Sequence, residues 1–331
     1  MGSNEMTNSI SGLSVPANGP HSKIETTSES ERFLADLFDV LWDRYRQRVE
    51  YVRMYEKVVR EAGGTFVNDH IAFRTLAGQN PLTGITSLSR IFTALGYRAI
   101  TCYQFEDKHL DAIHFQHPNA EFPKLFISEL RTWELSRDAQ TLLTELLATQ
   151  RPNLSMDALS SLANLEGLET AARKSLLETV VKIFHELPWN APEKDSVTTL
   201  NEESQYAAWV AVHGFNVNHF TALINSHGVE QLNDIEKTIA ALSAAGVPMK
   251  ANIEGEAGSR LRQSATEAVV IDVPVSENGS PGTMPWTYAY FELAERGNVT
   301  DPESGASTRF EGFLGPQATH LFEMTRRKKN N

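Results

Sequence analysis

Two histidines and one glutamate lie on three segments that are expected to form β-strands. His70 lies within FVNDHIAFRTL (66–76), His219 within FNVNHFTALIN (215–225) and Glu292 within the strand-like stretch 286–296. Two imidazoles and one carboxylate hold one face of a metal ion and leave positions open for a chelating substrate and O2, which suits non-haem Fe(II). The same ligands also hold Mn, Co, Ni or Zn, so the pattern predicts a metal site more firmly than it identifies the metal.

Alternation along the first strand places His70, Ala72 and Arg74 on one face. The other face is expected to pack in the core and carries Asp69, Ile71, Phe73 and Thr75. The polar face predicts a metal at His70 and an anion at Arg74, because an arginine side chain can lean back along the strand. The alternative is a hydrogen-bonded core histidine beside a surface cation, and the same alternative applies to His219 taken alone.

The carboxylate of Glu292 is predicted to be the third ligand. Tyr288, Tyr290 and Glu292 share one face of an aromatic and apolar strand, where an acid is costly unless it is paired or binds a metal. Glu295 has the opposite parity and is expected to face solvent. Glu129, in FISEL, is interpreted as the counterpart of Glu292 in an earlier module. It could be a fourth ligand, a group that orients a histidine, as Tyr290 could, or a paired structural carboxylate.

The elements that must position these residues repeat one pattern. Strand, helix and three strands are expected at 66–76, 82–96, 98–105, 110–116 and 123–130, and again at 215–225, 229–246, 249–254, 266–275 and 286–296. Helical periodicity fills the stretch between the two sets. The predicted fold is therefore α+β, with paired βαβββ modules at about 64–130 and 214–298 and a helical insertion at about 131–213.

The ends of the chain are expected to differ from its middle. Residues 1–29 are rich in Ser, Asn, Thr, Gly and Pro, which predicts a disordered tail. Helical periodicity begins near Ser30, so residues 30–331 are expected to form a single catalytic domain with N-terminal helices. The last part, about 305–327, is predicted to form a turn and a C-terminal helix; the family resemblance given below implies that this part covers the site as a lid.

Composition excludes several function classes. The chain has 331 residues, with 30 Lys and Arg against 42 Asp and Glu, for a net charge of −12. An acidic surface repels phosphate, which argues against nucleic-acid and anionic-membrane partners. A single cysteine, Cys102, allows no intrachain disulfide and no Cys-based zinc site. No apolar run approaches the ~18 residues of a membrane span, so a cytoplasmic protein is expected. The oligomeric state is left open.

Four strings in this order resemble a known family. They are N-D-H-I-A-F-R-T (68–75), F-I-S-E-L (126–130), N-H-F-T (218–221) and Y-F-E-L-A-E-R-G (290–297). Together they resemble the 2-oxoadipate dioxygenase/decarboxylase family, also called hydroxyglutarate synthase, of the vicinal oxygen chelate superfamily. The last strand and the tail are also similar to 4-hydroxyphenylpyruvate dioxygenase. The resemblance covers about residues 30–325 and implies paired βαβββ modules around a metal.

The resemblance also implies roles for individual residues. Its Fe(II) ligands fall on His70, His219 and Glu292, and its substrate-binding arginine falls on Arg74. Further residues carried over to the substrate or the lid are Arg262, Gln263, Phe313, Leu314 and Gln317. The implied reaction takes 2-oxoadipate and O2 to 2-hydroxyglutarate and CO2, as in lysine catabolism.

Two alternatives in other classes stay open. The same superfamily includes O2-independent, metal-dependent glyoxalase-like lyases or isomerases, which tolerate Zn or Ni. It also includes non-catalytic ligand-binding proteins. Dependence on O2 separates a dioxygenase from a lyase or isomerase, and metal content with turnover separates both from a binding protein.

Overall fold

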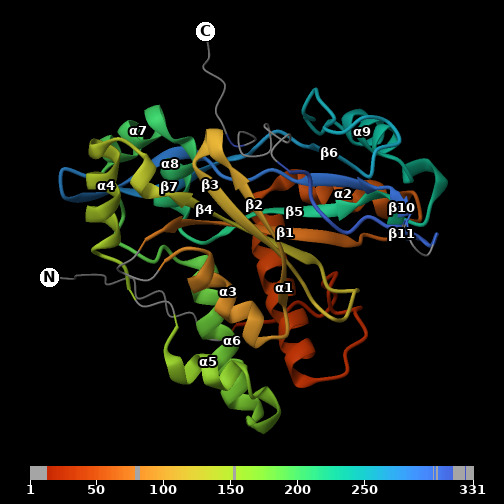
Figure 1. Cartoon of the computed structure of the whole chain (residues 1–331), viewed down its shortest axis with the longest axis horizontal. Helices are drawn as coiled ribbons and strands as arrows, with labels where there is room; N and C mark the ends of the chain where they lie inside the picture. The colour runs from red at the N-terminus through yellow and green to blue at the C-terminus, as the bar shows by residue number, and fades with distance from the viewer. Residues whose placement is uncertain are drawn as a thin grey trace, which may run out of the picture.

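The computed structural model describes residues 13–78, 83–151, 154–300, 302, 305–315 and 325 (Figure 1). Its helices are α1 (Glu29–Arg48), α2 (Glu50–Glu61), α3 (Ile85–Ala94), α4 (Arg137–Leu147), α5 (Met156–Leu162), α6 (Thr170–His185), α7 (Lys194–Glu203), α8 (Gln205–His213) and α9 (Ile235–Ala244). Its strands are β1 (Asn68–Ala77), β2 (Arg98–Phe105), β3 (Leu110–Gln116), β4 (Lys124–Arg131), β5 (Val217–Leu223), β6 (Leu261–Ala265), β7 (Val270–Glu277), β8 (Ser280–Thr287), β9 (Glu292–Arg296), β10 (Asn298–Thr300) and β11 (Ser307–Arg309).

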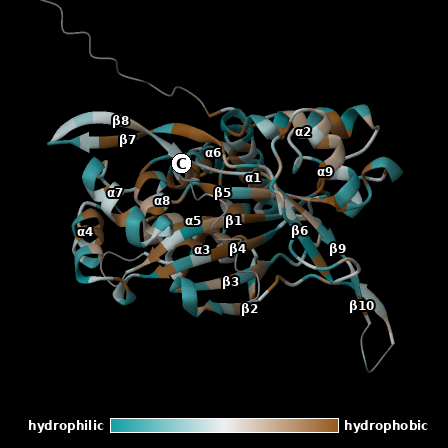
Figure 2. Cartoon of the chain, turned by 90° about the horizontal axis from the view of Figure 1, so that it is seen from above, coloured by the Kyte–Doolittle hydropathy of each residue, from teal (hydrophilic) through white to brown (hydrophobic). Residues whose placement is uncertain are grey.

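Seven strands form one curled sheet, in the order β2-β3-β4-β1-β5-β9-β6 (Figures 1 and 2). Strand β1 pairs in parallel with β4, and β5 pairs in parallel with β9. The two halves meet where β1 and β5 pair antiparallel. The predicted α+β fold with two joined modules is confirmed, and the junction of the modules lies at the middle of the sheet.

Helices α1, α3 and α6 cover the outer face of the sheet. Phe73 of β1 packs against Phe92 of α3 and Phe184 of α6, with ring centroids 5.4 and 5.1 Å away. Phe220 of β5 packs against Trp42 of α1 at 5.0 Å. The apolar face predicted for the first strand therefore lies in the core, which leaves the opposite face of β1 and β5 for chemistry.

The helical stretch between the modules consists of α4 to α8. Helix α8 has the sequence QYAAWVAVH, is apolar on all sides, and is buried from Tyr206 to His213, as expected for a helix inside a core. The indole of Trp209 donates to the carbonyl of Tyr288 at 2.6 Å. Because of this placement, α8 closes one end of the inner face of the sheet.

The second module differs from the predicted one. The stretch 249–254 forms isolated bridges, between Met249 and Thr266 and between Glu254 and Gln263, instead of a strand. Strand β6 was not predicted, and β7 and β8 form a separate two-stranded hairpin that projects from the body (Figure 2). Prolines within β7 and β8 suit such an edge position, because proline donates no ladder hydrogen bond.

Residues 13–28, which the sequence assigns to the N-terminal tail, have defined positions in the structure, and residues 1–12 lie outside the described residues. His21 is 1% exposed, its backbone N–H and ring bind Asp39 of α1, and its other ring nitrogen lies 2.9 Å from Asn68 of β1. Residues 13–28 therefore follow a defined path against α1, which composition could not indicate because the anchoring contacts are made by one histidine. Ser28 then caps α1 by accepting from the N–H of Glu31.

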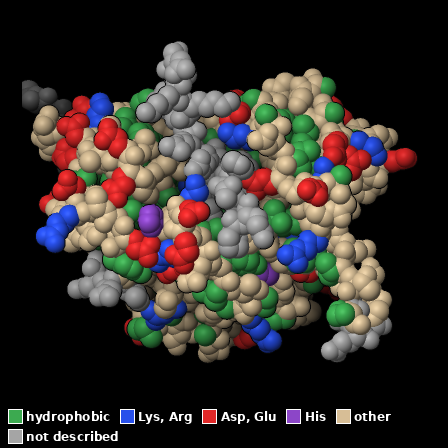
Figure 3. Space-filling view, turned by 45° about the horizontal axis from the view of Figure 1, so that its top comes forward, with side chains coloured by type: hydrophobic (Ala, Val, Ile, Leu, Met, Phe, Trp, Pro, Cys, Tyr) green, Lys and Arg blue, Asp and Glu red, His purple; other side chains and the backbone are tan. Residues whose placement is uncertain are grey.

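The predicted lid falls partly outside the described residues. Within 305–327 the structure describes 305–315 and Thr325, and the predicted C-terminal helix lies outside them. A short hairpin of β10 and β11, which the sequence did not indicate, leads into residues 310–315. Acidic side chains are spread over the face shown in Figure 3, in keeping with the net charge. In the part of the chain that is described, no helix has both the length and the apolar character needed to cross a membrane.

Candidate metal centre

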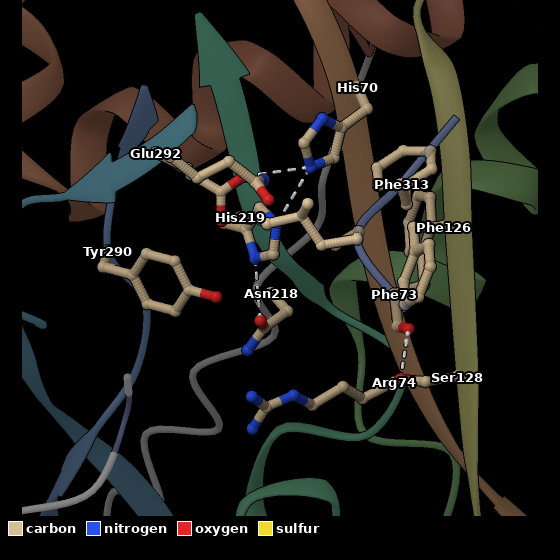
Figure 4. Close-up of a pocket in the computed structure, with 13 residues that line it drawn as sticks. His70, Phe73, Arg74, Phe126, Ser128, Asn218, His219, Tyr290, Glu292 and Phe313 are labelled. Atoms are coloured by element: carbon tan, nitrogen blue, oxygen red, sulfur yellow. Dashed lines mark hydrogen bonds and ion pairs between the residues drawn. The ribbon is translucent and has the colours of Figure 1, made fainter. Parts of the chain in front are cut away.

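The three predicted ligands converge at the junction of the modules (Figure 4). His70 comes from β1, His219 from β5 and Glu292 from the first residue of β9, and all three are buried. The sheet aligns them, because His70 lies opposite Thr221, which in turn is the parallel neighbour of Glu292. One ligand atom from each residue lies within 4.8 Å of the others.

The distances between ligand atoms fit one metal ion. The two Nε2 atoms are 3.4 Å apart, Nε2 of His70 is 3.2 Å from Oε1 of Glu292, and Nε2 of His219 is 3.5 Å from Oε2. Bonds of ~2.1 Å to a central ion separate neighbouring ligand atoms by ~3.0–3.4 Å in octahedral or tetrahedral geometry. Oε2 of Glu292 is also buried without a hydrogen-bond partner among the described residues. The donor set therefore fits a metal with two imidazoles and one carboxylate.

The charges of the three groups suit a cation between them. Burial lowers the pKa of His219 to about 3, so this imidazole is neutral. Burial also opposes the charged form of His70, but Asp69 and Glu292 outweigh it and raise the pKa of His70. For Glu292, burial raises the pKa, and the two histidines and Gln263 more than reverse this, so it is a carboxylate. Protons and a metal ion would compete for these nitrogen and oxygen atoms, so metal affinity here is expected to depend on pH.

A β-bulge in β1 places Asp69 beside His70. The register against β5 shifts by one residue between Asn68 and His70, which leaves Asp69 as the extra residue. Oδ2 of Asp69 lies 2.8 Å from Nδ1 of His70. Simple alternation placed Asp69 on the core face with Ile71, and that prediction is wrong because a bulge interrupts the alternation and re-aims the side chain.

A second bulge, in β5, places Asn218 beside His219. Ala72 pairs with His219 and Phe73 with Val217, so Asn218 is the extra residue on β5. Its Oδ1 lies 3.0 Å from Nδ1 of His219. Each ligand histidine is thus preceded by an Asx residue that accepts from Nδ1 and so presents the lone pair of Nε2 to the metal.

Asp69 is itself held by a buried arginine. Arg296, at the end of β9, donates to both carboxylate oxygens of Asp69, at 2.6 and 2.7 Å, and both side chains are fully buried. Nζ of Lys124 lies 3.9 Å from Oδ1 of Asp69. Although burial raises the pKa of Asp69, these two cations outweigh it and hold that pKa well below its usual range. Asp69 is therefore a fixed anion behind His70.

We expect Asp69→Asn to weaken the metal site without removing a ligand. The amide cannot stabilise a positively polarised imidazole as a carboxylate does, so the metal dissociation constant should rise about 10- to 100-fold. Metal titration under anaerobic conditions measures this. Thermal unfolding in a chelator separates loss of metal affinity from loss of fold, and a titration identical to that of the wild type would contradict the role of Asp69.

The carboxylate of Glu292 is held by neutral donors. Nε2 of Gln263, on β6, donates to Oε1 of Glu292 at 2.6 Å, and the hydroxyl of Thr221 lies 3.3 Å from the same oxygen. The ring of Tyr290 stacks on His219 with centroids 4.8 Å apart. These contacts fix the orientation of the side chains, with Oε1 of Glu292 near His70 and Oε2 near His219.

The three side chains open onto one cavity, which has an apolar wall beside His70 (Figure 4). Phe126 of β4 and Phe313 pack with centroids 4.9 Å apart, and Phe313 also contacts His70 at 4.8 Å. The described lining residues are His70, Ala72, Phe73, Arg74, Phe126, Ser128, Asn218, His219, Gln263, Tyr290, Glu292, Phe313 and Leu314. Among them Glu292 is the one carboxylate, so a ligand that brings its own negative charge meets little repulsion once a metal is bound.

Arg74 brings a cation into the same cavity, four residues after His70. Its Nη1 donates to the hydroxyl of Thr325 at 3.1 Å. Its guanidinium lies over the rings of Tyr206 and Trp209 of α8, at 5.0 and 5.3 Å. Burial lowers the pKa of Arg74, but a guanidinium stays protonated in proteins. The cavity therefore joins a metal site at one end to a fixed positive charge at the other.

A model of the 2-oxoadipate dioxygenase/decarboxylase family matches residues 35–323. The chain belongs to this family. It is 30% identical over 280 residues to the chloroplastic 2-oxoadipate dioxygenase/decarboxylase of Arabidopsis thaliana, covering 78% of the chain and 67% of the relative. It is 28% identical over 301 residues to the chloroplastic/amyloplastic enzyme of the same name from Oryza sativa, covering 84% of the chain and 72% of the relative.

Solved structures share the fold. A protein assigned to the glyoxalase superfamily from Ralstonia eutropha superposes with a TM-score of 0.75 at 22% identity, over 92% of this chain and 93% of its own. The hydroxyglutarate synthase of Oryza sativa in complex with 2-oxoadipate superposes with a TM-score of 0.71 at 23% identity, over 95% and 97%. These two solved structures therefore have the same overall fold as this member of the 2-oxoadipate dioxygenase/decarboxylase family.

Two neighbouring residues of β6 that the family resemblance implied for substrate binding point in opposite directions. Gln263 faces the cavity, whereas Arg262 points the other way and pairs with Glu236 of α9 and with Glu295. The structure therefore does not bring Arg262 to the described cavity. Side-chain alternation along LRQSA allows one of two neighbours to face inward, and Gln263 is that one.

The strand register changes the counterpart of Glu292. Phe126 lies opposite Ala72, two residues after His70, just as Glu292 lies opposite Thr221, two residues after His219. Phe126 is therefore the first-module equivalent of Glu292, and the interpretation of Glu129 as that equivalent is wrong. Glu129 is not among the described lining residues.

Glu129 and Glu295 share a structural role instead. Oε2 of Glu129 accepts from the N–H of Ile85 at the start of α3, and Oε2 of Glu295 accepts from the N–H of Ile235 at the start of α9, both at 2.7 Å. Each caps the helix of its own module, where a carboxylate is favoured by the helix dipole. Of the three roles considered for Glu129, that of a paired structural carboxylate agrees with its position at the start of α3.

The lid residues reach the site where they are described. Phe313 and Leu314 line the cavity, and Gln317 lies outside the described residues. Sequence reasoning missed Asp69 and Asn218 as supports of the ligands, and Tyr206 and Trp209 as the cover over Arg74. An Asx residue directly before each histidine was the signal that could have found the first two.

Proposed function

We propose that the protein is an Fe(II)-dependent dioxygenase/decarboxylase that converts 2-oxoadipate and O2 to 2-hydroxyglutarate and CO2, a step of lysine catabolism. The observation that carries the proposal is one buried cavity with a two-histidine, one-carboxylate ligand set at one end and Arg74 at the other. A dicarboxylic 2-oxo acid has the matching ends. The names of the curated relatives support the same substrate.

His70, His219 and Glu292 are the residues that would hold the Fe(II). When bound, this ion supplies O2 chemistry and chelation of the 2-oxo acid group, for which a facial three-ligand set leaves room. Asp69 keeps the ring of His70 oriented with its Nε2 toward the ion, and Gln263 does so for the carboxylate of Glu292. The protein thereby fixes the ligands before substrate arrives.

The remaining cavity residues bind and enclose the substrate. Arg74 binds the far carboxylate of the substrate by charge-assisted hydrogen bonds. Phe126, Phe313 and Leu314 cover the methylene chain and exclude water from the reacting end. Tyr290 packs on His219 and closes the side of the cavity. Binding at both ends holds the acid in one orientation, which lowers the entropic part of the barrier.

We expect Fe(II)-reconstituted protein to consume O2 when 2-oxoadipate is added. The products should be CO2 and 2-hydroxyglutarate in a 1:1 ratio to O2, because both atoms of O2 enter the products. An oxygen electrode with product analysis measures this, beside shorter and aromatic 2-oxo acids and a metal-stripped control. Turnover without O2 uptake would favour the lyase or isomerase class, and neither turnover nor metal content would favour a binding protein.

A further inference from the structure

Asn218 leaves one end of its amide pointing into the cavity. Oδ1 accepts from Nδ1 of His219, and Asn218 is 1% exposed. Its Nδ2 is buried with no hydrogen-bond partner among the described residues. A buried amide donor without a partner costs free energy, so this group is available to a ligand that accepts hydrogen bonds.

The bulge in β5 gives Asn218 this unusual position. On an unbroken strand, Asn218 would face the opposite side of the sheet from His219, yet both line the cavity. The register shift between Ala72 and Phe73 is what brings two consecutive side chains to one place. In Figure 4 the amide nitrogen of Asn218 points to the side of the cavity where the guanidinium of Arg74 lies.

The matching position in the first module shows what is particular about Asn218. Asp69 supports His70 in the same way, but it is an acid and Arg296 neutralises it behind the metal site. An acid at position 218 would instead face the cavity and compete for Arg74. A neutral amide gives His219 the same acceptor while adding a donor, rather than a charge, beside that arginine.

We infer that Asn218 is a specificity residue that donates, together with Arg74, to the far carboxylate of a dicarboxylic substrate. The inference rests on the proposed function for the identity of the substrate. It extends that function by linking the two ends of the cavity through one side chain, since the amide that holds His219 also recognises the far end of the acid. Dicarboxylic 2-oxo acids are therefore favoured over monocarboxylic acids of equal length.

Asn218→Asp tests this inference directly, because it keeps the acceptor for His219 and replaces the donor by an anion. The probes are 2-oxoadipate and 2-oxohexanoate, which has the same chain length without the far carboxylate. The KM and the anaerobic dissociation constant for 2-oxoadipate should rise about 100-fold, through loss of one charge-assisted bond and added repulsion. The values for 2-oxohexanoate should stay within about 3-fold.

Two further variants keep the test decisive. Asn218→Ala removes the donor without adding a charge. It should raise the KM and the dissociation constant for 2-oxoadipate about 10-fold and leave those for 2-oxohexanoate nearly unchanged. It replaces Asn218→Asp if that protein does not fold. Asp69→Asn is the matched control, because it alters the equivalent support of His70 away from Arg74. It should change metal affinity and leave the ratio of the two dissociation constants as in the wild type.

The outcomes separate this inference from the proposed function. If the Asn218 variants bind both acids more weakly by the same factor, or bind both as tightly as the wild type, the role of Asn218 is overturned. This holds even if wild-type protein turns over 2-oxoadipate. If wild-type protein binds 2-oxoadipate more tightly than 2-oxohexanoate, and Asn218→Asp removes the difference without any turnover, the inference stands and the proposed reaction fails. Wild-type protein that binds both acids equally would refute the inference.

Discussion

His70→Ala and Glu292→Ala are each expected to abolish stoichiometric iron binding and to lower turnover of 2-oxoadipate at least about 1000-fold. Each variant leaves two ligands where three converge within 4.8 Å. A two-ligand site loses most of its affinity, and the reaction depends on the ion. Iron content after reconstitution and desalting is the measurement, and circular dichroism checks that the fold is kept. Full iron content in either variant would refute the ligand assignment.

Glu295→Ala is the matched control for Glu292→Ala. The two acids lie on the same short strand, but Glu295 caps α9 and pairs with Arg262. Its loss should lower the free energy of unfolding by about 1 kcal/mol, as for a lost cap. Its iron content should match that of the wild type, and loss of iron here would mean that the choice between the two acids was wrong.

Arg74→Ala is expected to spare the metal and to lower kcat/KM for 2-oxoadipate by about 1000-fold. The side chain lies in the cavity but is not one of the three side chains whose ligand atoms converge, so iron content should be unchanged. Loss of a buried, charge-assisted bond to a carboxylate costs several kcal/mol, which corresponds to such a factor. Steady-state kinetics with iron-loaded protein measure it, and unchanged kcat/KM would remove Arg74 from the substrate site.

Arg262→Ala is the control for Arg74→Ala. The family resemblance suggested both arginines, but Arg262 pairs with Glu236 on the other face of β6. We expect kcat/KM within about 3-fold of the wild type, since Arg262 is not among the described residues that line the cavity. A large loss of activity would mean that Arg262 reaches the substrate through a rearrangement of β6.

Alternation and residue chemistry were enough to predict which two histidines and which glutamate converge at one place. His70 and Arg74 share a face of β1, and the parity of Glu292 against Glu295 selected the acid that lies in the centre. The predicted placement of these side chains agrees with the structure because β1 is regular against β4 from His70 to Arg74, and β9 is regular against β6 from Glu292 to Arg296. The ends of the sheet were harder, since the bridges at Met249 and Glu254 and the β7–β8 hairpin depend on pairing partners that one sequence does not reveal.

The supporting residues were missed for a physical reason. Asp69 and Asn218 lie in bulges, and a bulge reverses the face that strict alternation assigns to a side chain, so the Asx residue before each histidine was placed on the wrong face. Glu129 was misassigned because matching letters, rather than register, linked FISEL to YFEL. Arg296 could not be found by periodicity at all, since its role depends on reaching Asp69 across the sheet from 227 residues away in the sequence.

The equivalence of Phe126 and Glu292 has a consequence for the symmetry of the molecule. The modules are related by an approximate two-fold axis that passes between β1 and β5, and it exchanges His70 with His219. A perfectly symmetric molecule would offer four ligands at this centre, two imidazoles and two carboxylates. Phenylalanine at 126 breaks the symmetry at one corner. A metal ion held by His70, His219 and Glu292 would therefore meet the apolar ring of Phe126, rather than a fourth ligand, on the side of the first module.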